Sequence, residues 1–75
     1  VTDYEETTLK VEAIKAALNE LPDGYRVVLT LYLFEGYDHE EIAHILKITE
    51  TTSRSQYMRA KRKLNSLLEM KGVVR

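Results

Sequence analysis

The 75-residue chain contains no cysteine and no tryptophan, and only one proline and three glycines. Without cysteine, neither a disulfide framework nor a cysteine-ligated zinc site can support so short a chain. No apolar run approaches the roughly 20 residues that cross a bilayer, and the N-terminal segment VTDYEETT lacks the basic and apolar parts of a signal peptide. We therefore expect one small cytoplasmic domain with no membrane contact.

Positive charge is scarce in the first part of the chain and concentrated in the last. Residues 1–46 hold 3 basic and 10 acidic side chains, whereas residues 47–75 hold 8 basic and 2 acidic ones. The net charge of the whole chain is −1. The segment 47–64, KITETTSRSQYMRAKRKL, has six basic side chains and one acidic side chain. Such a run is either a solvated helix face or a binding surface for an anionic partner.

Helix is favoured throughout, because apolar and polar residues never alternate for more than a few positions. The four predicted helices start between Thr2 and Thr8, at Pro22, at Asp38 and at Thr49, and they end near Glu20, Gly36, Leu46 and Glu69 or Met70. Residues 1–6 are expected to be a frayed acidic lead-in, residues 7–70 the domain, and residues 71–75 a tail. The predicted fold class is thus all-α.

Local patterns support these boundaries. Asp38 followed three residues later by Glu41 predicts a capping box, and Pro22 suits the first position of a helix. The apolar residues at 11, 14, 18 and 21 predict one buried stripe on the first helix. The segment 25–34, YRVVLTLYLF, is apolar on nearly every side, which predicts a central helix packed from several directions, with its aromatic residues in the core.

The last helix is expected to have one buried and one basic face. At about 100° per residue, its buried sector contains Ser53, Tyr57, Ala60, Leu64, Leu67 and Leu68. The opposite face combines cations with short polar side chains, which suits the major groove of DNA. The residues predicted to contact bases are Arg54, Ser55, Met58 and Arg59, and the KRK at 61–63 is expected to meet phosphates. Ser53 is polar on the buried stripe, and we expect it to bond to the carbonyl four residues earlier, with looser packing.

A short capped helix, a tight turn and a basic helix in succession match the helix-turn-helix arrangement. The segment that starts at Leu21, LPDGYRVVLTLYLFEGYDHEEIAHILKITETTSRSQYMRAKRKL, resembles region 4, the minus-35 promoter-binding domain, of bacterial extracytoplasmic-function (ECF) sigma factors of the sigma-70 family. The resemblance implies a four-helix domain with a C-terminal helix-turn-helix and no wing. It also implies three partners: promoter DNA, the RNA polymerase core through its beta-subunit flap, and commonly an anti-sigma factor.

The resemblance also assigns roles to individual positions. Arg54, Ser55, Met58 and Arg59 correspond to the positions that face the minus-35 element. The residues expected near the DNA backbone are Arg26, His39, Thr51, Thr52, Lys61, Arg62 and Lys63. Lys47 stands where the family usually has glycine, so a left-handed conformation there would cost about 1–2 kcal/mol. Ser53 replaces a frequent valine, and Met58 lies where aromatic residues or histidine are common, so base preference does not carry over.

No metal site, cofactor or enzymatic activity is expected. The HEEIAH segment places His39 and His44 five residues apart, whereas the zinc-protease motif needs four. His39 is instead expected to be a first-turn surface residue, with a phosphate contact as the second interpretation. No glycine-rich phosphate loop or nucleophile elbow occurs.

Two other functions remain compatible with the sequence. One is the effector domain of a response-regulator-type transcription regulator, which would bind a two-fold symmetric DNA site as a dimer. The other is a sigma-like protein-interaction module whose basic face meets an acidic partner instead of DNA.

Overall fold

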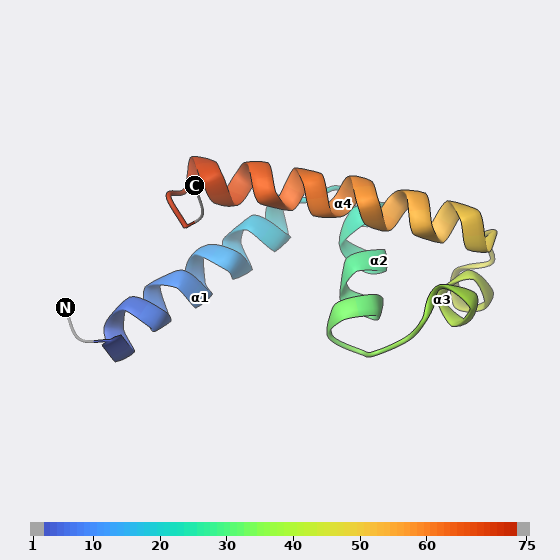
Figure 1. Ribbon diagram of the computed structural model, residues 1–75, viewed down its shortest axis with the longest axis horizontal. Helices are drawn as coiled ribbons and strands as arrows, with labels where there is room; N and C mark the ends of the chain where they lie inside the picture. The colour runs from blue at the N-terminus through green and yellow to red at the C-terminus, as the bar shows by residue number, and fades with distance from the viewer. Residues whose placement is uncertain (1–2, 74–75) are drawn as a thin grey trace.

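The computed structural model describes residues 3–73, which form four helices and no strand (Figure 1). The helices are α1 (Asp3–Glu20), α2 (Asp23–Leu33), α3 (His39–Leu46) and α4 (Glu50–Met70). The molecule measures 45 × 21 × 17 Å, and α4 lies along its long edge with α2 and α3 against its N-terminal half. The predicted all-α fold is confirmed. Within the described range, no helix is both long and apolar enough to cross a membrane.

Helix α1 diverges from the C-terminal half of α4 (Figure 1). It begins at Asp3, so residues 3–6, expected to be a lead-in, are helical from that point, and neither Thr7 nor Thr8 is its cap. Thr2, the other candidate cap, lies outside the described residues. The predicted stripe is buried at its C-terminal end, at Leu21, but Val11 is 42% exposed because the N-terminal part of α1 lies away from α4.

Helix α2 is not covered along its whole length. Val28 and Leu29 are buried, but Leu33, on the same face as Leu29, is 51% exposed, and Phe34, directly after the helix, is 63% exposed. Other helices contact α2 from more than one direction, as predicted, but the predicted burial does not reach its C-terminal end. The physical reason is that α2 runs away from α4 (Figure 1). Pro22 also differs from the prediction, since it is the N-cap of α2 and not the first helical residue.

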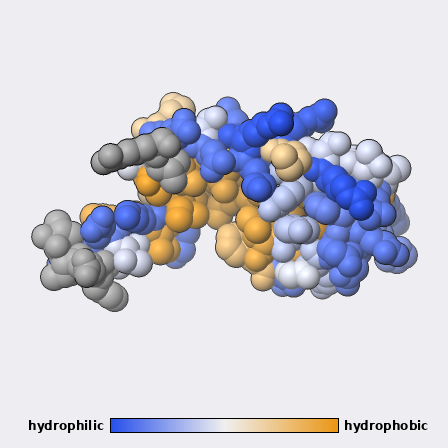
Figure 2. Space-filling view, in the orientation of Figure 1, coloured by the Kyte–Doolittle hydropathy of each residue, from blue (hydrophilic) through white to orange (hydrophobic). Residues whose placement is uncertain are grey.

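The core lies where α1, α2 and α4 meet. Leu21, Leu29 and Ala60 form its buried centre, and the partly buried residues packed against it are Leu18, Tyr25, Tyr57, Leu64 and Leu67. Figure 2 shows apolar side chains gathered on the surface where α1 and α2 approach α4, and hydrophilic ones along α4. Tyr37, like Phe34, lies outside the core, since it is 37% exposed.

The N-terminal ends of α3 and α4 are both capped as predicted. The Asp38 carboxylate accepts a hydrogen bond from the Glu41 N–H at 2.8 Å, and the Glu41 carboxylate accepts one from the Asp38 N–H at 3.1 Å. At the start of α4, the Thr49 hydroxyl accepts a hydrogen bond from the Thr52 N–H at 3.0 Å. These caps fix where α3 begins and where α4 begins, and a three-residue turn at 47–49 separates the end of α3 from the start of α4.

Lys47 ends α3 in the left-handed conformation, with φ of 58°. Among the described residues it is the one non-glycine residue with positive φ, at the position where the resemblance has glycine. We expect Lys47→Gly to raise the free energy of unfolding by about 0.5–1 kcal/mol, because the relieved strain exceeds the extra backbone entropy of glycine. Urea denaturation followed by circular dichroism measures this change. Lys47→Ala is the control: an equal gain there would assign the effect to the lost charge and contradict the backbone explanation.

Candidate nucleic-acid interface

The buried and exposed faces of α4 lie where the sequence places them. Ser53, Ala60 and Leu68 are buried, and the other three residues of the predicted sector are partly buried. On the opposite side, Arg54, Met58 and Arg59 are exposed. The hydrophobic stripe therefore fixes the rotation of α4 and turns its cations outward.

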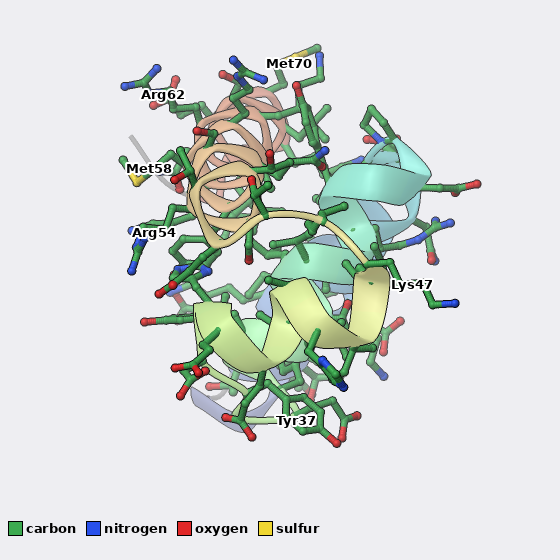
Figure 3. The ribbon with its side chains drawn as sticks, turned by 90° about the vertical axis from the view of Figure 1, so that its right-hand side faces the viewer. Tyr37, Lys47, Arg54, Met58, Arg62 and Met70 are labelled. Atoms are coloured by element: carbon green, nitrogen blue, oxygen red, sulfur yellow. The ribbon has the colours of Figure 1, made fainter. Side chains whose placement is uncertain are left out.

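The four predicted base-contact residues share one surface. Together with Arg62 they line a shallow depression of about 280 Å³ on α4. In Figure 3, Arg54, Met58 and Arg62 project from the same side of α4, away from Lys47 and Tyr37. This depression combines guanidinium donors, a hydroxyl and an apolar side chain, the groups that recognise base edges and thymine methyls in a major groove. We call these five residues the α4 outer face.

The α4 outer face carries unpaired positive charge in its second half. Within residues 3–73, no ion pair involves Arg59, Arg62 or Lys63. Arg54 differs, because one of its guanidinium nitrogens lies 2.5 Å from a Glu50 carboxylate oxygen. Both side chains of this pair are about half exposed, at 57% and 45%, so solvent screens the attraction between them.

The residues predicted to contact the DNA backbone are less tightly grouped. Thr51 and the cations at 61–63 are exposed on α4, although the Lys61 ammonium lies 5.4 Å from the centre of the Tyr57 ring. Thr52 takes part in the helix cap, since its hydroxyl accepts a hydrogen bond from the Thr49 hydroxyl at 2.7 Å. Arg26 lies on α2, where it pairs with Asp23 and donates to the Asn19 carbonyl at 3.3 Å. It is therefore held at the turn between α1 and α2.

His39 and Ser53 depart from the sequence-based predictions. His39 is partly buried, not a surface residue, and its Nδ1 lies 2.9 Å from the Ser53 hydroxyl oxygen. Ser53 is fully buried, and its hydroxyl bonds across to α3 and not, as expected, within its own helix. The two residues are 14 positions apart, and no local pattern links them.

One functional candidate, Glu50, went unnoticed in the sequence. Its spacing to Arg54 is i, i+4, which is the helical spacing for an ion pair, and this signal could have identified it. The described residues contain no group of three His, Cys, Asp or Glu side chains arranged to hold a metal ion. The exposed guanidinium and hydroxyl groups of the α4 outer face can bind anions and hydrogen-bonding edges.

Comparison with known proteins identifies the family. The family model described as Sigma-70, region 4, matches residues 11–64. ECF RNA polymerase sigma factor SigM of Bacillus subtilis (strain 168) is 38% identical over 56 residues, which cover 75% of this chain and 34% of the relative. ECF RNA polymerase sigma factor EcfG of Rhodopseudomonas palustris (strain TIE-1) is 36% identical over 64 residues, covering 85% and 35% of the two chains. The RNA polymerase sigma-H factor of Pseudomonas aeruginosa is 33% identical over 61 residues, covering 80% and 32%.

The chain thus spans about a third of the length of these curated relatives. The family match covers α2, α3, most of α4 and the second half of α1. Those elements include the turn, the caps and the α4 outer face. The predicted resemblance to region 4 of ECF sigma factors is confirmed, and the chain belongs to the sigma-70 region 4 family.

Proposed function

We propose that this chain recognises the minus-35 promoter element by placing α4 in the major groove, and that it acts in transcription initiation by directing RNA polymerase to promoters. One observation carries the proposal: all four predicted base-contact residues lie in a single exposed depression beside Arg62. The capped turn at 47–49 supports it, because it leaves the first turns of α4 exposed for entry into the groove.

Within this proposal the residues divide into two roles. Arg54, Ser55, Met58 and Arg59 contact bases, whereas Arg62 and the flanking cations contact phosphates. The phosphate-contacting set also includes Thr51, Thr52, Lys61, Lys63, Arg26 and His39. His39 would contact a phosphate through atoms other than Nδ1, which bonds to Ser53. Phosphate contacts supply affinity that falls with salt, and base contacts supply preference.

The proposed partners are the RNA polymerase core, through its beta-subunit flap, and an anti-sigma factor. Several exposed apolar side chains support a protein-binding surface on α1 and α2: Leu9, Val11, Val27, Leu33 and Phe34. They lie on α1 and α2 or directly after α2, and Figure 2 shows apolar side chains on the surface of these helices. Exposed apolar patches mark protein interaction sites. We place the protein in the cytoplasm, where both partners would meet it.

The test is selection of bound sequences from a random DNA pool by the 75-residue chain, followed by measurement of affinity against salt concentration. We expect an asymmetric selected site, and a log–log salt slope of about −0.9 for each phosphate contacted. A two-fold symmetric site would instead indicate the dimeric response-regulator type. Binding without any sequence preference would contradict base reading and favour the protein-interaction module.

The Glu50–Arg54 ion pair predicts that Glu50 weakens DNA binding. Glu50→Gln is expected to raise affinity for every DNA sequence by about 1.4- to fivefold, because an exposed pair of this kind is worth about 0.2–1 kcal/mol. The salt slope is expected to steepen by up to about 0.9, since the substitution adds one net positive charge to the surface that meets DNA. Fluorescence anisotropy over a salt series measures both.

Glu69→Gln is the matched control for this prediction. It removes the same charge from the other end of α4, where Glu69 makes no ion pair among the described residues. Equal effects of the two substitutions would show that only net charge matters and would remove the assigned role of the Glu50–Arg54 pair.

A further inference from the structure

The hydroxyl of Ser53 is buried at the contact between α3 and α4. Ser53 is 0% exposed and is the one polar residue in the described part of the chain that is classed as buried. A buried hydroxyl is costly unless it is hydrogen-bonded, and here Ser53 Oγ lies 2.9 Å from His39 Nδ1. The first residue of α3 is thereby joined to the fourth residue of α4.

The His39 ring is itself held by two aromatic rings from neighbouring helices. The Tyr32 ring of α2 stacks on it at 4.6 Å between centroids with an interplanar angle of 19°. The Tyr57 ring of α4 meets it edge-on at 5.5 Å, and the two tyrosine rings lie 4.5 Å apart. The capping box at Asp38 and Glu41 fixes the backbone of His39 at the start of α3. Three helices thus converge on one histidine.

This contact lies directly behind the residues proposed to read DNA. Ser53 immediately precedes Arg54 and Ser55 in α4, and the hydrophobic stripe that fixes the rotation of α4 has Ser53 as its first residue. We infer that His39 and Ser53 are positioning residues for DNA reading: their hydrogen bond sets the tilt at which the N-terminal turns of α4 present Arg54 and Ser55. The inference rests on the proposed function, since it assigns to this pair the alignment that base recognition requires.

Sequence preference and overall affinity for DNA should respond differently to loss of this alignment. Hydrogen bonds to base edges depend on donor geometry at the level of tenths of an ångström, whereas attraction to phosphates tolerates displacement. A change in the tilt of α4 therefore lowers preference for the selected sequence more than it lowers affinity for unrelated DNA.

A double-mutant cycle on the 75-residue chain tests the pair. The variants are Ser53→Ala, His39→Phe, which keeps an aromatic ring beside Tyr32, and the combination. We expect the two changes in the unfolding equilibrium constant to be non-additive by about three- to tenfold, the range for one hydrogen bond. Each single change should also lower the affinity ratio between the selected sequence and a shuffled one by about tenfold, equivalent to one weakened base contact.

A conservative variant separates hydrogen bonding from ring packing. The Asn side chain can place a polar atom near the position of Nδ1 but has no ring to stack. We expect His39→Asn to keep the sequence preference within about threefold of the wild-type value, while losing stability from the lost stacking. His44→Phe and Ser66→Ala are the controls, because both residues are exposed on the same two helices outside this contact.

A spectroscopic readout tests the contact without DNA. Ser53→Ala is expected to shift the ¹⁵N resonance of His39 Nδ1 and to leave that of His44 unchanged. Additive unfolding effects together with an unmoved Nδ1 resonance would overturn the inference even if the wild-type chain selects a DNA sequence. If the two substitutions are non-additive in unfolding but the wild-type chain selects no DNA sequence, the proposed function is overturned and, with it, the positioning role. Variants that weaken binding to all sequences alike would leave the pair a stabilising contact only.

Discussion

Leu29→Ala is expected to lower the free energy of unfolding by about 2–5 kcal/mol, the range for removing a fully buried leucine side chain. Leu29 is 0% exposed and forms the centre of the core with Leu21 and Ala60. A domain of 75 residues buries little apolar surface, so a loss of this size takes most of its stability. Urea denaturation followed by circular dichroism at 222 nm, a standard helix wavelength, measures the change.

Leu33→Ala is the matched control for Leu29→Ala. Leu33 lies four residues further along α2, at 51% exposure, and the substitution removes the same atoms. Because leucine and alanine both favour helix, we expect a change of about 0.5 kcal/mol or less. Similar losses at the two positions would mean that the C-terminal turn of α2 is covered as well, which would contradict the exposure of Leu33.

Arg59→Ala is expected to lower the preference for the selected DNA sequence by about 1–3 kcal/mol, which is about 5- to 150-fold. Arg59 is exposed, lies in the α4 outer face and makes no ion pair within residues 3–73, so its guanidinium is available to a base edge. The measurement is the ratio of dissociation constants for the selected sequence and a shuffled sequence at one fixed salt concentration.

Lys63→Ala separates base reading from charge in this experiment. It removes one positive charge from the same helix, as Arg59→Ala does, but from a residue outside the depression. We expect it to weaken binding to both sequences alike and to reduce the magnitude of the salt slope by about 0.9. The base-contact role of Arg59 would be abandoned if its replacement also weakened both sequences equally.

Elements defined by neighbouring residues were predicted well. The capping box at Asp38 and the N-cap at Thr49 follow from side chains within three or four positions of each other, and the structure confirms both. The buried and basic faces of α4 follow from helical geometry alone. Four residues of the α4 outer face could therefore be named as base contacts before any tertiary contact was known.

Features that depend on which helix packs against which were predicted poorly. The segment 25–34 is apolar on nearly every side, yet the composition of one helix does not state how many neighbours will cover it. Helix α2 runs away from α4, so Phe34, directly after its C-terminal end, remains 63% exposed. For the same reason Val11, which continues the apolar spacing of α1, lies where α1 has already diverged from α4.

The sequence by itself determined the helices, their caps, the polarity of α4 and, through the order of these elements, the family. These properties depend on hydrogen bonds and side-chain spacing within a few residues, which the linear order specifies directly. Only the tertiary structure decided the roles of His39 and Ser53, because a hydrogen bond across 14 positions exists only once α3 and α4 have packed. The polar residue that seemed out of place on a buried stripe is satisfied by a histidine whose own ring is enclosed by two tyrosines.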